Sequence, residues 1–264
     1  MPEPTQIEDY LFDLQGYIIL RKAVSKEEVK ILNEALDPYT SMDTDEWRGW
    51  VHRYKKTEIH CLYEIGEPYE RLLDHPSWID HMRKWCSSGN GKLFIDEAFV
   101  NVRGQGGKTG MHNGGHHGTQ RTQYRFRDGQ FRCGQINAIL ALTDIGPADG
   151  ATMIIPGSHK ANLMHPAYLD EANRPRSLEN VEGAIEVHLE AGDAVLFVDC
   201  MSHGSAERIN PGERRIVIYR YGPHWAQSRY GHKPSPEVLA RVTPSQREIL
   251  EPISPLLPSI AHNP

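Results

Sequence analysis

The sequence predicts one mainly β-stranded domain of 264 residues that opens with helices. From residue 92 onward, short runs rich in β-branched and aromatic residues follow one another, and Gly, Pro, Asn and Asp punctuate them as turn residues. Apolar residues at helical spacing are concentrated before that point. With 39% hydrophobic residues the chain can bury a complete core, and no internal repeat divides it. We therefore expect a single barrel-type domain over residues 1–264.

Residues 1–90 are expected to give mostly helical support to this barrel. Residues 16–20 have the composition of a short strand. Ser25 and Glu28 then form the pattern of a capping box, and apolar residues follow at helical spacing. A second helix is expected within residues 69–86.

Residues 91–225 are expected to form the β core, and residues 226–264 a last helix and a tail. The predicted strands are 92–103, 131–145, 151–155, 184–189, 194–198 and 214–221. The last helix begins at Thr243, which is followed by a proline in the favoured first turn. The proline-rich residues after it are expected to wrap the surface.

Charge and cysteine content exclude several classes of protein. The net charge of −6 and the pI near 6.2 argue against binding to a nucleic-acid polymer. The four cysteines have no metal-ligand spacing and resemble reduced, buried thiols. The first residues lack a basic and apolar leader, and no run reaches the ~20 apolar residues of a membrane span. We therefore expect a cytoplasmic protein without a membrane partner; the sequence does not indicate its oligomeric state.

Two histidines carry the strongest chemical signal. His112 lies in a glycine-rich stretch, and His203 follows the strand-like run 194–198. Two histidines and a carboxylate two residues after the first form the facial triad that holds ferrous iron in oxygenases. Here Gly114 occupies the position of the carboxylate. Either the site is inactive, or one coordination position is left for another ligand.

Two predicted strands have a polar face. Gln135 and Asn137 alternate with apolar residues, which suits either a barrel interior or a solvent-exposed face. In the last strand, Arg214 and Arg220 share one face with two isoleucines, while Arg215 lies on the other. An arginine that begins a strand shortly after a histidine ligand could hold a carboxylate bidentately inside a barrel.

Several motifs together resemble the phytanoyl-CoA dioxygenase family of iron(II)/2-oxoglutarate-dependent enzymes, over nearly the whole chain. The most specific motif is Ile155-Pro156-Gly157-Ser158-His159-Lys160. The others are residues 16–20 with the Ser25 helix, residues 141–144, Gly150, residues 192–197, and His203-Gly204 followed by Arg214. The resemblance implies a double-stranded β-helix, or jelly roll, with helices on one side and iron at the barrel mouth.

The resemblance also implies roles for individual residues. His112 and His203 match the two histidine ligands of iron. Arg214 matches the arginine that anchors the distal carboxylate of 2-oxoglutarate. Asn137 and Gln135 fall where polar side chains contact this cosubstrate.

Gly114 departs from the hydroxylases of the family, which carry aspartate at that position. It resembles instead the iron halogenases of the same superfamily, which carry glycine or alanine there. Loss of the carboxylate opens a coordination position and removes one negative charge. Chloride can fill that position and replace that charge. The resemblance therefore implies a halogenase that uses iron(II), 2-oxoglutarate, O2 and chloride to chlorinate an aliphatic C–H bond.

Two other functions stay open. The first is a hydroxylase in which water or a relocated acid, such as Asp128, Asp199 or Glu97, completes the iron site. The second is a non-catalytic relative that binds 2-oxoglutarate or a nucleotide. The retained histidines, arginine and amide face favour an active enzyme, because an abandoned site has no reason to keep them.

A basic stretch beside His112 suggests the charge of the substrate. Between residues 103 and 132 there are six Lys or Arg residues and one acid. Because such groups bind phosphate and carboxylate, Lys108, Arg121 and Arg125 are candidates for holding a small anionic substrate. A solvated hairpin is the alternative explanation of the same pattern.

Among halogenases, the chain most resembles the nucleotide-chlorinating type of nucleoside-antibiotic biosynthesis. This resemblance implies a substrate such as deoxyadenosine monophosphate. Tyrosine and tryptophan rings could then stack on the purine, and the candidates are Tyr124, Tyr219, Tyr221 and Trp225.

The remaining histidines have weaker signals. His112 and His116 have the spacing of a helical metal pair, but Gly114, Gly115 and Gly118 disfavour a helix there. His159 is expected to fix its own turn through hydrogen bonds.

Overall fold

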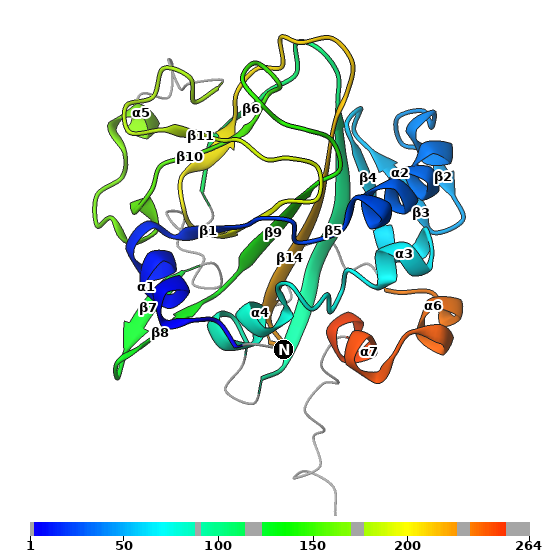
Figure 1. The fold of residues 1–264 in the computed structure, drawn as a ribbon, viewed down its shortest axis with the longest axis horizontal. Coiled ribbons are helices and arrows are strands. Elements are labelled where there is room, and N and C mark those ends of the chain that lie inside the picture. The colour runs from blue at the N-terminus through cyan, green and yellow to red at the C-terminus, as the bar shows by residue number, and fades with distance from the viewer. Residues whose placement is uncertain (1–2, 88–90, 114–122, 170–176, 226–232, 252–264) are drawn as a thin grey trace, which may run out of the picture.

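Two antiparallel sheets enclose the interior of a barrel in the computed structural model, which describes residues 3–87, 91–113, 123–169, 177–225 and 233–251 (Figure 1). The larger sheet has eight strands in the order β1-β12-β9-β14-β5-β4-β3-β2. Their bounds are β1 Tyr17–Leu20, β12 Ala194–Val198, β9 Ile136–Ala141, β14 Arg214–Pro223, β5 Leu93–Arg103, β4 Glu58–His60, β3 Val51–Tyr54 and β2 Trp47–Arg48.

The smaller sheet has four strands in the order β11-β10-β13-β6. Their bounds are β11 Ile185–Val187, β10 Thr152–Ile154, β13 His203–Ser205 and β6 Thr109–His112. A separate hairpin pairs β7 (Tyr124–Arg127) with β8 (Gln130–Cys133). The architecture confirms the predicted fold class, a mainly β jelly roll with flanking helices.

The helices begin where the sequence supplies caps. Ser25 and Glu28 form both hydrogen bonds of a capping box at the start of α2 (Lys26–Thr40), and Thr243 does so with Gln246 at α7 (Pro244–Leu250). The other helices are α1 Gln6–Gln15, η1 Leu62–Glu64, α3 Glu67–Glu70, α4 Ile79–Trp85, η3 Ser158–Lys160, α5 Pro166–Leu169 and α6 Pro236–Arg241. Within the described ranges, none of the helices is long and apolar enough to cross a membrane.

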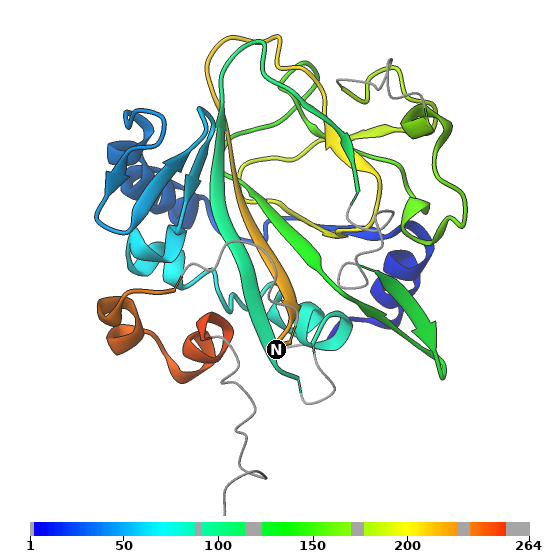
Figure 2. The same cartoon turned by 180° about the vertical axis from the view of Figure 1, so that it is seen from behind.

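Three expectations about elements need correction. Residues 69–86 hold two short helices, α3 and α4, joined by turns, in place of one helix. The predicted strand 131–145 is two strands in different sheets, β8 and β9, because the chain bends at Gly134. The N-terminal part also contributes β2–β4, which were not predicted and which extend the larger sheet beyond the long strands β5 and β14 (Figure 2).

The two faces of β14 separate the barrel interior from the helical layer. Arg214, with the residues that alternate with it, lines the interior. On the opposite face, Arg215 forms an ion pair with Asp37 of α2 at 2.6 Å, and Tyr219 donates to the carbonyl of Tyr69 in α3 at 2.7 Å. The predicted division of this strand into an inner and an outer face is confirmed. All four cysteines are buried and unpaired, as expected.

Candidate functional site

The histidine pair is brought together by the pairing of β6 with β13. His112 and His203 are direct register partners, and their ring centroids lie 4.1 Å apart. The Nδ1 atom of His112 lies 2.9 Å from the carbonyl oxygen of Gly110, and that of His203 lies 2.7 Å from the carbonyl of Met201. Because a carbonyl only accepts, both Nδ1 atoms carry the proton, and Nε2 is the unprotonated ring nitrogen. Metal-binding histidines are oriented in this way.

His203 is held in the neutral form that a metal requires. Burial, and next the proximity of His112, lower the pKa of His203 to about 3. The ring of Phe197 packs against the imidazole, with the centroids 4.9 Å apart. A neutral imidazole binds a metal ion without first losing a proton.

A cavity of about 270 Å³ lies between the two sheets and reaches both histidines. Among the described residues, four basic side chains line it, from Lys55, Arg103, Arg214 and Arg220, against one carboxylate, that of Glu58. A cavity with this lining attracts anions.

Arg214 is the most deeply buried of these cations, with 1% of its surface exposed. It donates to the carbonyl oxygen of Gly150 and, at 2.7 Å, to Oδ1 of Asn101. Its Nε has no hydrogen-bond partner, and it forms no ion pair with a carboxylate, among the described residues. Burial, and then the charges of Arg103 and Arg208, lower the pKa of Arg214. A buried guanidinium in this state is stabilised by an incoming carboxylate.

Arg103 is a site residue that sequence reasoning missed. It is the register partner of Arg214 across β5 and β14, and it is also buried. Its guanidinium donates to the hydroxyls of Ser205 and Thr109, which lie on the same two strands as the histidines. Burial lowers its pKa to about 10. A signal existed in the sequence, since an arginine ends a long apolar strand, but only the register of β5 with β14 places it beside Arg214.

The two amides of the β9 region differ in position. Asn137 lines the cavity; its Nδ2 donates to Asp199 at 2.9 Å, and its Oδ1 has no partner among the described residues. Gln135 does not line the cavity, and its Nε2 donates to Asp96 at 2.9 Å. The structure thus brings Asn137 but not Gln135 to the histidine pair.

None of the three relocated acids joins the histidines. Asp128 lies at an exposed hairpin turn beside Arg127. Asp199 accepts from Asn137, and Glu97 accepts from Arg220 at 2.6 Å. In the part of the chain that the structure describes, no three His, Cys, Asp or Glu side chains form a group that could hold a metal ion. Gly114 lies outside the described residues.

The predicted substrate residues that the structure describes do not line this cavity. Lys108 forms an ion pair with Glu207 at 2.6 Å, and Arg125 lies on the exposed face of β7. Tyr221 is fully buried, and its hydroxyl accepts from Trp78 at 3.0 Å and donates to backbone carbonyls. Trp225 is 54% exposed and does not line the cavity. Arg121 lies outside the described residues.

His159 has a structural role, but its ring bonds to helix α1 and not within its own turn as expected. Its Nε2 donates to the carbonyl oxygen of Asp13 in α1 at 3.0 Å, and burial lowers its pKa to about 4. Gly16 lies against this ring with a φ of +82°, and a Cβ there would meet the imidazole at 2.5 Å. Only glycine fits at that position.

The sequence has recognisable relatives. Residues 12–216 match the family described as Phytanoyl-CoA dioxygenase (PhyH). Dioxygenase swnH2 of Arthroderma benhamiae is 25% identical over 242 residues, covering 83% of this chain and 71% of its own length. Ectoine dioxygenase of Streptomyces coelicolor is 26% identical over 241 residues, covering 82% and 77%. Dioxygenase cdmD of Talaromyces verruculosus is 30% identical over 128 residues, which span 48% of this chain and 38% of that protein.

Solved structures share the fold. HygX from Streptomyces hygroscopicus, with nickel and 2-oxoglutarate bound, superposes with a TM-score of 0.68 at 21% identity over 83% of this chain and 87% of that one. EctD from S. alaskensis, with 2-oxoglutarate and 5-hydroxyectoine, gives 0.63 at 21% identity over 94% and 88%. The family match covers most of the chain, and the jelly roll agrees with it. The chain therefore belongs to the phytanoyl-CoA dioxygenase family of iron(II)/2-oxoglutarate-dependent enzymes.

Proposed function

We propose that this chain is an iron(II)/2-oxoglutarate-dependent halogenase that chlorinates an aliphatic C–H bond of a small molecule. One observation carries the proposal. Two histidines face each other at one cavity, glycine stands two residues after the first in the sequence, and no described carboxylate forms a metal-binding group with them. The protein side chains would then supply two ligands of the iron, and chloride would fill the coordination position that the family's aspartate otherwise takes.

The residues of the cavity fit the iron and the cosubstrate. The Nε2 atoms of His112 and His203 would hold the ferrous ion, and Arg214 would receive the distal carboxylate of 2-oxoglutarate. Arg103 lies beside Arg214 and adds a second positive charge at that end of the cavity. When bound, iron and 2-oxoglutarate supply the activation of O2. The chain itself orients the imidazoles through two backbone carbonyls and supplies positive charge along the cavity wall.

The charge of the cavity favours an added anion. Two imidazole ligands, which are neutral when they bind a metal, would leave the charge of the metal ion uncompensated, and the described part of the lining has four basic groups against one acid. An enzyme of this family with aspartate would place one negative charge on the metal. When the aspartate is missing, a bound halide would restore the negative charge at that coordination position. This charge balance is the physical argument that a halide, and not an empty position, completes the site.

Hydroxylation is the second candidate. It is favoured by the relatives, since swnH2, cdmD and the ectoine enzyme are all named dioxygenases. In that case water would occupy the position beside Gly114, and oxygen would enter the substrate in place of chlorine.

The substrate class we propose is a small anionic molecule, with deoxyadenosine monophosphate as the specific candidate. Structural neighbours are recorded with small polar compounds, HygX with hygromycin B and EctD with 5-hydroxyectoine. These neighbours support a small-molecule substrate for this enzyme. The phosphate group of the proposed substrate is inferred from the resemblance to nucleotide halogenases.

Turnover with and without chloride tests the proposal. The purified protein is supplied with iron(II), 2-oxoglutarate, O2 and the candidate nucleotide, and succinate and the product mass are measured. We expect a product in which chlorine replaces one hydrogen, formed only with chloride. A hydroxylated product formed at equal rates with and without saturating chloride would support the second candidate and refute the first.

A further inference from the structure

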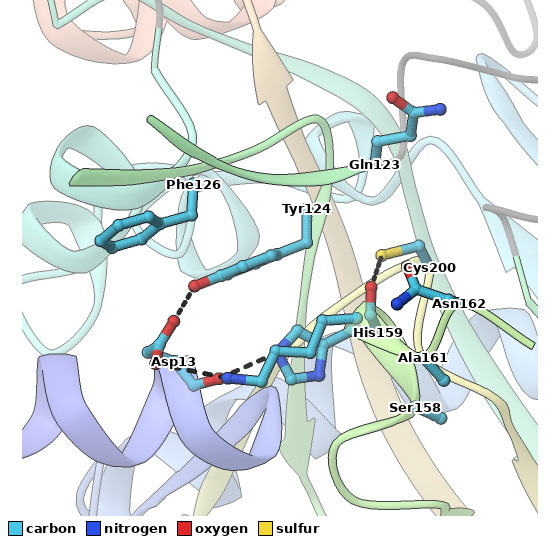
Figure 3. A pocket seen from close by; sticks show the side chains of 10 residues that line it. Asp13, Gln123, Tyr124, Phe126, Ser158, His159, Ala161, Asn162 and Cys200 are labelled. Atoms are coloured by element: carbon cyan, nitrogen blue, oxygen red, sulfur yellow. Dashed lines mark hydrogen bonds and ion pairs between the residues drawn. The ribbon is translucent and has the colours of Figure 1, made fainter. Parts of the chain in front are cut away.

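We propose that a second hollow, next to the histidine pair, binds the organic substrate, and that it takes a flat heterocycle with an amide-like hydrogen-bonding edge and an acidic substituent. The hollow has a volume of about 630 Å³ and lies between hairpin β7–β8, α1 and η3 (Figure 3). The inference rests on the proposed function, because it concerns the substrate of the same metal site.

The volumes of the two spaces show why a second space is needed. Small-molecule sites usually measure about 300–1,000 Å³. The cavity between the sheets, at about 270 Å³, is below that range and has the charged lining that suits a dicarboxylate. The hollow, at about 630 Å³, falls within the range. We therefore assign the cosubstrate to the cavity and the organic substrate to the hollow.

Aromatic rings make one wall of the hollow. Tyr124 and Phe126 alternate along β7 and therefore share a face. Tyr124 is held in place, because its hydroxyl donates to Asp13 and its ring packs edge to face with His159, with centroids 4.8 Å apart. Phe126 is 64% exposed. An exposed ring beside a fixed one offers a flat partner to a planar ligand.

A primary amide supplies the hydrogen-bonding edge. Asn162 lines the hollow, and its side chain makes no hydrogen bond within the described part of the chain (Figure 3). A primary amide presents a donor and an acceptor side by side. This pattern complements the edge of a base or lactam, as the pairing of Asn or Gln with adenine illustrates.

Lys160 supplies charge at the rim of the hollow. Its ammonium lies 3.3 Å from a carboxylate oxygen of Asp13 and is 40% exposed. An ammonium has three donors, so two remain for a phosphate or carboxylate on the ligand. Lys160 thus takes the role that the sequence suggested for Lys108 and Arg125.

The hollow borders the segment that holds His203. The Cys200 thiol contacts the carbonyl of His159 at 3.6 Å, and the backbone N–H of Ser202 donates to Oγ of Ser158 at 2.8 Å. His203 follows Cys200 by three positions, so their Cα atoms lie at most about 11 Å apart. The part of the hollow that Cys200 lines is therefore within a small molecule's length of His203.

Binding to the metal-free protein tests the site independently of turnover. The probes are deoxyadenosine monophosphate, deoxyadenosine and ribose 5-phosphate, and calorimetry gives each Kd. The variants are Phe126→Ala and Asn162→Leu, and the matched control is Arg125→Ala, whose side chain lies on the opposite face of β7. We expect the monophosphate to bind best. Phe126→Ala should weaken it by about 5- to 160-fold, since stacking on one base contributes about 1–3 kcal/mol, while Arg125→Ala leaves the Kd unchanged.

A second measurement locates the bound probe. Mn(II) is added to occupy His112 and His203, and the NMR relaxation of the probe is recorded. Strong relaxation, absent in His112→Ala, supports a substrate site beside the metal. The inference is overturned if no probe binds, if Phe126→Ala and Asn162→Leu bind as tightly as the unmodified protein, or if the bound probe is not relaxed by Mn(II). Failure of the proposed function has a different signature: tight binding in the hollow with no chloride-dependent product.

Discussion

Replacing Arg214 by glutamine is the sharpest test of the assignment of the cavity. Arg214 is 1% exposed, it is surrounded by neutral oxygens, and its closest charged neighbours are arginines. When a buried, hydrogen-bonded charge pair loses one partner, the loss is about 2–5 kcal/mol. We therefore expect Arg214→Gln to raise the Kd for 2-oxoglutarate by roughly 30-fold or more.

The effect on folding should be much smaller than the effect on binding. In the absence of cosubstrate, the guanidinium is buried without a carboxylate, so its desolvation already opposes folding. Glutamine can keep a hydrogen bond to Asn101 or Gly150. The free energy of unfolding of the cosubstrate-free variant should therefore change by no more than about 2 kcal/mol.

Calorimetric titration of 2-oxoglutarate into the nickel-loaded protein measures the effect, and urea unfolding gives the stability. Arg215→Gln is the matched control, since Arg215 points to the helices and pairs with the exposed Asp37, a contact that contributes about 0–1 kcal/mol. If Arg215→Gln loses cosubstrate binding and Arg214→Gln retains it, the cavity has been assigned to the wrong ligand.

Three other changes test the metal site and the fold. His112→Ala should abolish stoichiometric iron(II) binding in an anaerobic titration, whereas His188→Ala, an exposed histidine beside Glu186, should not; full affinity in His112→Ala would reject the ligand assignment. Gly114→Asp should replace chloride by a carboxylate, so mass spectrometry should find chlorination lost and hydroxylation gained. Undiminished chlorination would contradict the proposal that chloride occupies the coordination position beside Gly114. Burial raises the pKa of Asp193, but hydrogen bonds from Lys22, Arg21 and Glu190 outweigh it, and the net pKa is lowered. This carboxylate therefore stabilises the fold above its unfolded pKa of about 3.9 and loses that contribution as the pH falls through its folded pKa. Urea unfolding across the acidic range should show that the free energy of unfolding falls less steeply with decreasing pH for Asp193→Asn than for the unmodified protein. Parallel curves for the two proteins would exclude Asp193 as a source of the pH dependence of stability.

The sequence by itself determined the features that depend on neighbours along the chain. Capping at Ser25 needs only the side chain three residues later, and it formed as predicted. The alternation of side chains along β14 is equally local, so the inward position of Arg214 and the outward position of Arg215 followed from the strand pattern. The family motifs, which are short and local, indicated the jelly roll.

Only the tertiary structure decided which distant residues meet. The register of β6 with β13 faces His112 with His203, and the register of β5 with β14 puts Arg103 beside Arg214. The same long-range packing buries Tyr221 in the core. Composition could mark such residues as polar, basic or aromatic. It could not tell which of them face a cavity, because that depends on strand pairing and helix packing between segments that lie far apart in the sequence.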